Sequence, residues 1–181
     1  CVNDIICQGA KPLFFLDYYA MGKLDLDKEK DIIKGINEGC KKSGCLLLGG
    51  ETAELPFLYK DNNFDLAGFS VGIIEHDVYP KNINEGDLIF GIKSNGIHSN
   101  GYSLIHKILE NNEYDLNELI KPTKIYIDDI NYLKQKYNDS IKGFSHITGG
   151  GLIDNIPRIL NKGYNIDIHC KWDIPDVFKW I

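Results

Sequence analysis

The sequence predicts an α/β protein of two domains, with strands and helices mixed along the chain. Apolar runs rich in aromatic and β-branched residues predict strands, and apolar residues at helical spacing predict helices. A polar, turn-rich stretch at residues 76–86 divides the 181 residues into two halves. A chain of this length suits one large domain or two small ones. We therefore expect an N-terminal domain at residues 1–78 and a C-terminal domain at residues 86–181.

The first half contains the elements of a sheet domain. Pro12–Ala20 predicts a strand, because it is aromatic and is bounded by proline and by Met-Gly. Apolar residues at helical spacing follow, with Asp27 as the expected N-cap and Gly44 as the expected stop. Residues 45–50 predict a buried strand that ends at two glycines and enters a loop. Phe64–Glu75 predicts a long strand, in which small residues allow close backbone approach.

The second half repeats the mixture of strands and helices. Residues 87–93 predict a strand, and a helix is expected at about Tyr102–Leu109. The stretch 123–137 has apolar residues in a helical pattern and predicts a second helix. Residues 141–160 predict a strand, a glycine-rich loop and a helix, and the alternation in 163–170 predicts a last strand.

Composition excludes several classes of protein. The net charge is −6, and no basic tract is interleaved with aromatic residues, so we expect no nucleic-acid partner. The apolar runs are too short for a membrane-spanning helix, and no signal peptide is present, so we expect no membrane association. Cysteines lie at 1, 7, 40, 45 and 170, without the C-x-x-C spacing of a zinc or redox site. We expect reduced thiols and a cytoplasmic location.

Two stretches of the first half carry candidate ligands for a phosphate or a metal ion. In GGETAELP, Gly49 and Gly50 would let the backbone approach a phosphate, and Glu51 would bind Mg²⁺ directly or through water. The competing interpretation is a tight turn in which Glu51 is solvated. Asp4 is either a metal-binding carboxylate near this loop or the N-cap of a short helix. Spacing alone does not decide between these readings.

The stretch KSNGIHSNGYSLIHKIL holds two Asn-Gly pairs with an imidazole and a hydroxyl between them. Asn-Gly favours turns with positive φ. This candidate loop places four polar residues ahead of an expected helix N-terminus, which attracts anions: Asn95, His98, Ser99 and Asn100. His98 could donate to a phosphate or act as an acid or base. The competing interpretation is a two-turn connection in which Asn100 caps the helix.

A second glycine-rich loop, HITGGGLIDNIP, follows at residues 146–157. The three consecutive glycines lie between an expected strand and an expected helix, so main-chain N–H groups could cradle an anion. The spacing is not that of a dinucleotide-binding fingerprint, and the Gly-Lys-Ser/Thr of a P-loop is absent. The competing interpretation is a flexible connection.

Several stretches together resemble the phosphoribosylformylglycinamidine cyclo-ligase family, also called aminoimidazole ribonucleotide synthetases. The resemblance is specific as a whole, because it runs in order over nearly the whole chain, and the final WDIPDVFKWI resembles the family's tail region. GGETAELP and HSNGYSL together favour this family over its superfamily relatives. The remaining matching stretches are CVNDIICQGAKPLFFLDYYAMGKLD, FDLAGFSVGIIE and HITGGGLIDNIPRIL.

The resemblance implies a reaction in purine synthesis. ATP phosphorylates the formyl amide oxygen of formylglycinamidine ribonucleotide, and the amidine nitrogen then closes the imidazole ring and expels phosphate. The family implies ATP and Mg²⁺, with Asp4 and Glu51 as metal ligands. The positions implied at ATP are Asp4, Gly49, Gly50, Glu51, Thr52 and Gly68. The positions implied as catalytic are His98, Asn100 and His146, and those implied at the substrate are Ser99, Thr148, Gly149, Gly150 and Gly151.

The family also implies an architecture of two α/β domains, in which two N-terminal sheet domains form the barrel of a homodimer. Pro12–Ala20 and Phe64–Glu75 are the expected interface strands. The family carries a further N-terminal segment with ATP-binding motifs, and its C-terminal end extends further. We therefore expect this chain to be a fragment, weak or inactive alone, of a full-length enzyme. Two alternatives stay open: a formylglycinamidine ribonucleotide synthetase-like enzyme, and a dimeric nucleotide-binding module without catalysis.

Overall fold

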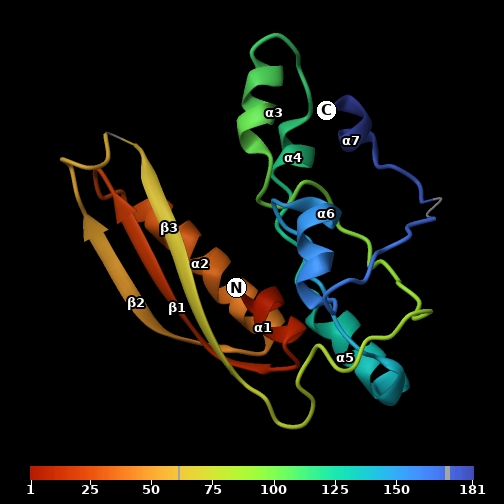
Figure 1. The fold of residues 1–181 in the computed structure, drawn as a ribbon. Helices are drawn as coiled ribbons and strands as arrows, with labels where there is room; N and C mark the ends of the chain where they lie inside the picture. The colour runs from red at the N-terminus through yellow and green to blue at the C-terminus, as the bar shows by residue number, and fades with distance from the viewer. Residues whose placement is uncertain (61, 170–171) are drawn as a thin grey trace. The chain divides into compact units, whose positions relative to one another are not determined.

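The computed structural model describes residues 1–60, 62–169 and 172–181 (Figure 1). The chain forms two compact units. Unit 1 comprises Cys1–Lys81 and Ile125–Phe144, and unit 2 comprises Asn82–Lys124 and Ser145–Ile181. The α/β class is confirmed, since a mixed sheet and helices form the described residues. The expected domain bounds stay a prediction, because compactness assigns residues 125–144 to unit 1.

Unit 1 is built on a sheet of three strands with the order β2-β1-β3 (Figure 1). The strands are β1 at Lys11–Met21, β2 at Leu46–Glu54 and β3 at Phe64–Ile73. β1 is the central strand, parallel to β2 and antiparallel to β3. The three expected strands of the first half are confirmed as strands. The expected burial of the second one is wrong, because β2 lies at the edge of the sheet, where Leu46 is 71% exposed and Leu48 is 62% exposed. β2 also runs on through Gly49 and Gly50 to Glu54, so the expected loop at these glycines is wrong.

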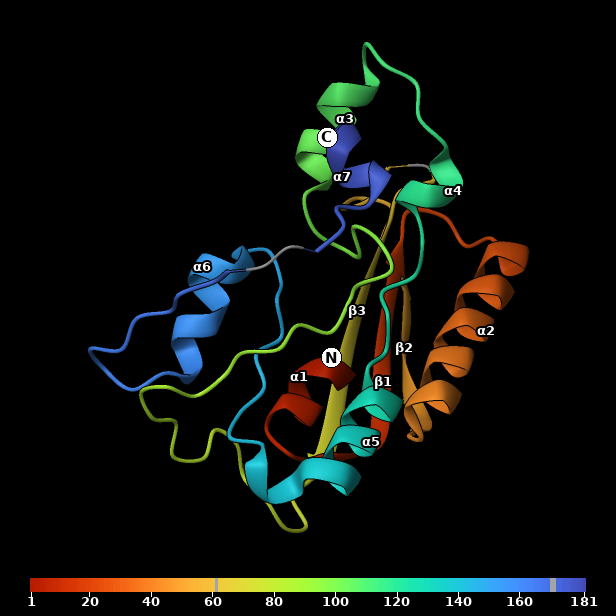
Figure 2. The same ribbon diagram turned by 90° about the vertical axis from the view of Figure 1, so that its right-hand side faces the viewer.

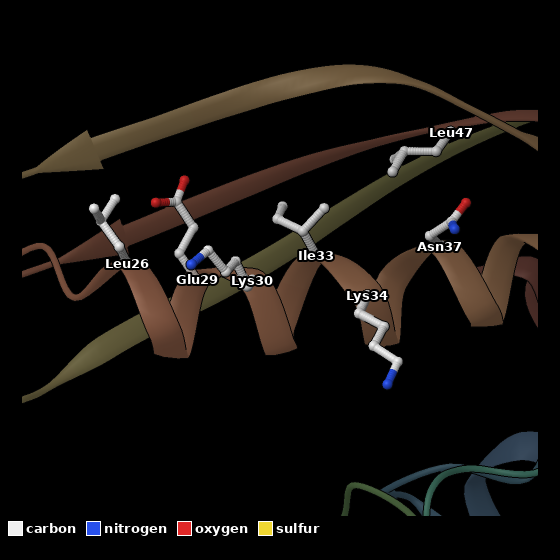
Figure 3. Close-up of a pocket in the computed structure, with 7 residues that line it drawn as sticks. All are labelled: Leu26, Glu29, Lys30, Ile33, Lys34, Asn37 and Leu47. Carbon is white, nitrogen blue, oxygen red and sulfur yellow. The ribbon is translucent and has the colours of Figure 1, made fainter.

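Helices cover one face of this sheet, which we call the helix face and which carries Phe15, Asp17 and Tyr19 of β1. Cross-strand partners share a face, and a side chain at Gly68 of β3, the partner of Asp17, would meet Phe15 and the Sγ of Cys1. The Cys1 residue precedes α1 at Val2–Cys7. The long helix α2, Leu26–Ser43, lies over the same face toward β2 (Figure 3).

The ends of α2 follow from local chemistry. The carboxylate of Asp25, and not of Asp27, caps the helix by accepting hydrogen bonds from the backbone N–H groups of Asp27 and Lys28. Asp25 has the extended backbone of an N-cap, whereas Asp27 already lies in the first turn. The expected stop at Gly44 is confirmed, because this residue adopts φ 64° and closes the helix C-terminus.

The opposite face of the sheet, which we call the open face, carries Phe14, Leu16 and Tyr18 of β1. Their cross-strand partners on β3 are Val71, Phe69 and Ala67. No helix of unit 1 is packed on this face among the described residues, and Phe69 is 62% exposed. An apolar sheet face of this kind is rarely left in water.

The rest of unit 1 packs against α1. The helix α5, Ile127–Tyr137, confirms the expected second helix and is followed by the short 3₁₀ helix η1, Asn138–Ser140. The side chain of Asn3 accepts a hydrogen bond from the backbone N–H of Tyr126 at 3.1 Å. Tyr79 is buried in this part of unit 1. Its ring lies edge-on to the ring of Phe144, with 4.9 Å between the ring centroids.

Unit 2 is mainly helical and has a small core of Ile97, Ile105, Leu119 and Val177. This core joins α3, α4 and α7, which lie together in Figure 2. The helix expected at Tyr102–Leu109 is confirmed as α3. The remaining elements are α4 at Leu116–Leu119, α6 at Gly151–Asn155, the 3₁₀ helix η2 at Ile156–Ile159, and α7 at Asp176–Trp180.

The strands expected in the second half are wrong within the residues that the structure covers. Residues 87–93, 141–146 and 163–169 are irregular, and residue 170 lies outside the described part. A strand needs a neighbouring strand to pair with, and the one sheet of the described structure contains only β1, β2 and β3. Leu88 and Phe90 are accordingly more than four-fifths exposed, at 81% and 84%. Within the same described ranges, no helix is both long and apolar enough to cross a membrane.

Candidate functional site

The strongest candidate site in unit 2 is the loop of residues 94–101, whose backbone takes unusual conformations. Gly96 has φ 145° and Gly101 has φ 79°, as the two Asn-Gly pairs predict. His98 between them also has positive φ, 61°, and is the one non-glycine residue with this property in the described chain. Left-handed backbone disfavours a side chain with a Cβ. The fold therefore holds His98 in a strained conformation.

The imidazole of His98 is held from several sides. Its Nε2 lies 2.8 Å from the Oδ1 of Asn95 and 3.3 Å from the backbone N of Lys124. Burial, then the nearby His146 and Lys124, lower the pKa of His98 below its usual value of 6.5. Each of these effects disfavours the imidazolium. His98 is therefore neutral at pH 7 and able to accept a proton.

Tyr102, the first residue of α3, secures the same loop. Its hydroxyl lies 2.6 Å from the carbonyl oxygen of Leu119 and 3.2 Å from that of His98. The hydroxyl has one proton, which it donates to the nearer carbonyl and shares with the farther one. This hydrogen bond thus links the backbone carbonyl of His98 to α3.

Asn100 connects this loop with the glycine-rich loop at residues 146–151. Its Oδ1 lies 3.2 Å from the position that a Cβ on Gly149 would occupy. Asn100 does not cap α3, because Gly101 is the N-cap and no side chain bonds to the first turn. That competing interpretation is therefore wrong. Ser99 is exposed between His98 and Asn100.

The glycine-rich loop is held by Asn155 of α6, which is only 3% exposed. Its Nδ2 donates to the carbonyl oxygen of Gly151 at 2.7 Å, and its Oδ1 accepts from the hydroxyl of Thr148 at 3.1 Å. A side chain at Gly150 would collide with Asp154. The structure thus brings His98, Asn100, His146, Thr148 and Gly149 into one part of unit 2.

The candidate residues of unit 1 are not gathered in this way. Asp4 lies in the first turn of α1, so it is not the N-cap, and its carboxylate is 3.7 Å from the N-terminal amine. Glu51 is exposed on β2 opposite Tyr18, so it projects from the open face. Helix α1 covers the helix face. Asp4 and Glu51 therefore lie on different faces of the sheet.

Metal-binding geometry is correspondingly lacking in the described residues. No group of three or more His, Cys, Asp or Glu side chains there is arranged to hold a metal ion. Mg²⁺ prefers six oxygen ligands in near-ideal octahedral geometry, and it usually takes one or two of them from carboxylates. Asp4 and Glu51, on separate faces, do not form a shared site for this ion.

Two of the three glycines expected at ATP have a packing role in unit 1, whereas a Cβ added at Gly49 would have nothing within 4 Å. Gly50 and Gly68 are the cross-strand partners of Asp17 on its two sides. A side chain at Gly50 would collide with the Asp17 carboxylate, and one at Gly68 would collide with Phe15. Thr52, two residues beyond Gly50, is exposed. The roles of these residues in nucleotide binding stay predictions.

The buried Cys40 does not add a reactive thiolate to the site. Cys1, Cys7, Cys40 and Cys45 form no disulfide bond, and Cys170 lies outside the described residues. Burial, then the neighbouring Cys45, raise the pKa of the Cys40 thiol to about 11. A thiol with so high a pKa stays protonated at neutral pH and is a poor nucleophile.

A groove of about 520 Å³ runs between α2 and the edge of the sheet (Figure 3). Leu47 of β2 points toward Ile33 across the groove, while Lys34 points away from the sheet. The groove contains none of the residues expected at ATP or substrate. Its lining residues are Leu26, Glu29, Lys30, Ile33, Lys34, Asn37 and Leu47.

Three residues that hold the site together were not among the expected site residues. Asn95 contacts the imidazole of His98, Tyr102 binds the His98 carbonyl, and Asn155 holds the glycine-rich loop. Asn95 was named in the candidate loop, as part of the first Asn-Gly pair, but its role as a partner of His98 was not predicted. The roles of Asn155 and Tyr102 could not be predicted from the sequence, because their partners depend on how the loops meet.

Comparisons with known proteins identify the family to which this chain belongs. Residues 1–74 match the family "AIR synthase related protein, N-terminal domain", and residues 84–181 match the corresponding C-terminal domain. A protein of Clostridium perfringens strain 13, named phosphoribosylformylglycinamidine cyclo-ligase, is 51% identical over 99% of this chain and 56% of its own length. A protein of the same name from Thermoanaerobacter pseudethanolicus is 52% identical over the whole chain and 58% of its own length.

The chain therefore spans a little more than half the length of the relatives it matches. Solved structures support the fold alone. Thiamine monophosphate kinase from Aquifex aeolicus matches 74% of this chain and 45% of its own, with a TM-score of 0.52 and 23% identity. A chain of a HypE–HypF complex matches 75% of this chain and 44% of its own, with a TM-score of 0.52 and 20% identity.

Proposed function

This chain belongs to the AIR synthase related protein family, and we propose that the protein is an ATP-dependent cyclo-ligase of purine synthesis. It converts formylglycinamidine ribonucleotide to aminoimidazole ribonucleotide, with ADP and phosphate as the other products. One observation carries this proposal: about half of the residues, over 99% of the chain, are identical to those of proteins named for this reaction. The matched stretch includes both candidate loops of unit 2.

The reaction needs two bond-forming steps. In the first, the γ-phosphoryl group is transferred from ATP to the formyl amide oxygen, ADP is released, and the phosphorylated oxygen becomes a leaving group. In the second, the amidine nitrogen attacks the activated carbon, the C–O bond breaks, phosphate departs, and one N–H proton passes to a base. Ring closure joins two ends of one molecule, so the protein's main contribution is positioning.

The loops of unit 2 suit the substrate side of this reaction. His98 is neutral and can take the proton of the attacking nitrogen. Asn100 and Ser99 offer polar groups beside it. In the glycine-rich loop, Thr148, Gly149 and Gly150 supply backbone N–H groups for a phosphate. The N–H of Gly151 instead closes the loop by donating to the Thr148 carbonyl at 2.9 Å. His146, which helps to lower the pKa of His98, is proposed as a second residue of this catalytic group. These assignments are part of the proposal.

The nucleotide is proposed to bind at unit 1, where the family resemblance implies Gly49, Gly50, Thr52 and Gly68. Glu51 and Asp4 do not form a joint Mg²⁺ site in this structure, because they lie on different faces of the sheet. A metal ion at the phosphates would need ligands besides these two. We therefore assign no step of the reaction to Mg²⁺.

The functional form is proposed to be a homodimer that pairs two open faces. The exposed apolar residues of β1, β2 and β3 support this, because burying such a face is favourable. β1 takes part through its face and not through its edge, since β2 and β3 occupy both of its edges. A cytoplasmic location is proposed as well, supported by the four cysteines of the described residues, which form no disulfide bond.

The decisive experiment supplies Mg-ATP and formylglycinamidine ribonucleotide, without glutamine or ammonia, to the complete gene product and to this chain alone. Formation of ADP and aminoimidazole ribonucleotide by the complete product would establish the cyclo-ligase. Turnover of formylglycinamide ribonucleotide that depends on glutamine or ammonia would favour the synthetase-like alternative. ATP binding without turnover of either substrate would favour a binding module. Turnover at a normal enzymatic rate by this chain alone would contradict its expected inactivity.

A further inference from the structure

The side-chain amide of Asn95 lies between the His98 ring and the carbonyl of Pro122. Asn95 Nδ2 is 2.8 Å from the Pro122 carbonyl oxygen, and Asn95 Oδ1 is 2.8 Å from His98 Nε2. The Pro122 carbonyl can only accept a hydrogen bond, so the group facing it must be the NH₂ of the amide. Turning the amide over would place two oxygens 2.8 Å apart. The amide oxygen therefore faces the imidazole.

This orientation determines the tautomer of the ring. An amide oxygen has no proton to donate, so a contact of 2.8 Å with Nε2 is a hydrogen bond only if Nε2 carries the proton. Two backbone N–H groups also approach Nε2, that of Lys124 at 3.3 Å and that of Asn95 at 3.5 Å. These contacts are longer than a normal hydrogen bond, and the shorter bond to the amide prevails. In the neutral ring, Nδ1 is then the nitrogen that accepts a proton.

The backbone supports the same arrangement. His98 is held at φ 61°, and the Tyr102 hydroxyl binds its carbonyl. A strained conformation persists only where surrounding contacts determine it. The ring is thus constrained through its backbone by Tyr102 and through Nε2 by Asn95. A ring fixed in both position and tautomer offers one basic nitrogen in one direction.

We propose that Asn95 is a positioning residue, which holds the proton of His98 on Nε2 and so makes Nδ1 the proton-accepting atom of the site. The proposal rests on the proposed function for its catalytic meaning. When Nδ1 takes the proton of the attacking nitrogen, the ring becomes imidazolium and its Nε2–H bond to Asn95 strengthens. The groups that face this charge are His146 and Lys124, which oppose it, so the amide oxygen is the favourable partner.

The tautomer can be measured without any enzyme assay. Long-range proton–nitrogen correlation spectra of the ¹⁵N-labelled chain, at pH 7.5, distinguish a protonated from an unprotonated ring nitrogen. The His98 signals are assigned by their loss in His98→Gln. We expect the wild type to show the proton on Nε2 alone. Asn95→Ala should give two tautomers in exchange, whereas Asn95→Asp keeps an acceptor, so it should retain the Nε2–H form and raise the pKa of His98 by about one unit.

Asn112→Ala is the matched control, because Asn112 binds only the backbone of α3 among the described contacts. It should leave the His98 signals unchanged. A wild-type ring with its proton on Nδ1 would overturn the proposal, as would an unchanged single tautomer in Asn95→Ala. If Asn95→Ala does not fold, the Asn95→Asp titration decides: a raised pKa with the Nε2–H form supports the proposal, and an unchanged pKa contradicts it.

Kinetics connect the tautomer with turnover in the complete gene product. Asn95→Ala should lower kcat by about tenfold to a hundredfold, with recovery in Asn95→Asp and little change in KM. Absence of aminoimidazole ribonucleotide formation in the wild type would contradict the proposed function while leaving the tautomer result in place. Full activity in an Asn95→Ala protein with mixed tautomers would instead overturn the positioning role alone.

Discussion

At the scale of single residues, His98 combines two unfavourable properties. Its backbone lies in a region that suits glycine, and its ring is partly buried beside another imidazole and a lysine. Neither property helps the protein to fold, and both must be offset by contacts elsewhere. Strain and a perturbed pKa in one residue, next to a polar loop, are typical of a functional position.

Replacing His98 should therefore separate activity from stability. His98→Ala should cut turnover of the complete gene product by roughly a hundredfold or more, because it removes the proposed base. The free energy of unfolding should change far less, since the lost ring contacts are partly offset by relief of its desolvation. Urea unfolding and steady-state kinetics on the same preparation measure both. An equal relative loss of activity and stability would indicate that His98 has a structural role instead.

The lowered pKa of His98 also predicts how stability depends on pH. The unfolded chain binds a proton to His98 near the usual pKa of 6.5, whereas the folded chain binds it only at lower pH. The contribution of His98 to the free energy of unfolding is therefore fully present above about pH 6.5. It decreases as the pH drops through and below that value. His98→Gln should reduce this fall relative to the wild type. Urea midpoints at pH 7.5 and 5 test the difference.

At the scale of elements, α2 illustrates how local chemistry determines a boundary. Gly44 ends the helix with φ 64°, and Gly35 lies within the helix. A Cβ added at either position would have nothing within 4 Å. Differences between substitutions at these two sites therefore report backbone conformation and not packing.

Alanine at these two glycines should change stability in opposite directions. Gly44→Ala should lower the free energy of unfolding by about 1 kcal/mol, because alanine disfavours the left-handed conformation. Gly35→Ala should raise it by about 0.5–1 kcal/mol, because alanine is the better helix former. Chemical denaturation of the two variants beside the wild type measures both effects. Stabilisation by Gly44→Ala would mean that the helix does not end in this left-handed turn.

At the scale of the whole molecule, the open face of the sheet raises the question of what covers it. Phe69 on β3 is 62% exposed and Leu46 on β2 is 71% exposed, on a face that carries mostly apolar side chains. Phe57, in the β2–β3 connection, is exposed as fully as a residue can be, at 102%. The two phenylalanines thus provide a test position and a control position of the same residue type.

Substitution on the open face should dissociate the proposed homodimer. Phe69→Glu places a charge in the centre of the interface and should shift the mass in solution from two chains to one, with a loss of at least tenfold in dimer affinity. Phe57→Glu, outside the strands, should leave the dimer in place. Sedimentation equilibrium or light scattering over a range of concentrations measures the mass. A monomeric wild type, or equal dissociation by both variants, would contradict the proposed interface.

Local patterns identified part of this architecture correctly. The strands near Pro12–Ala20 and Phe64–Glu75, the helix Tyr102–Leu109 and the stop at Gly44 follow from short-range chemistry, so they could be predicted. The strands expected after residue 86 could not, because a strand exists only with a paired neighbour. The prediction of a loop at Gly49 and Gly50 was wrong, because pairing with β1 continues the strand through both glycines.

The sequence by itself determined the family, the double Asn-Gly turn and the residue types at the candidate site, because each depends on residues close together in the chain. Only the tertiary structure decided which of those residues meet. It placed Asn95 against the ring of His98 and Asn100 against Gly149, and it separated Asp4 from Glu51 by a sheet. Contacts between distant segments depend on how strands pair and loops pack, and no local pattern in the chain specifies them.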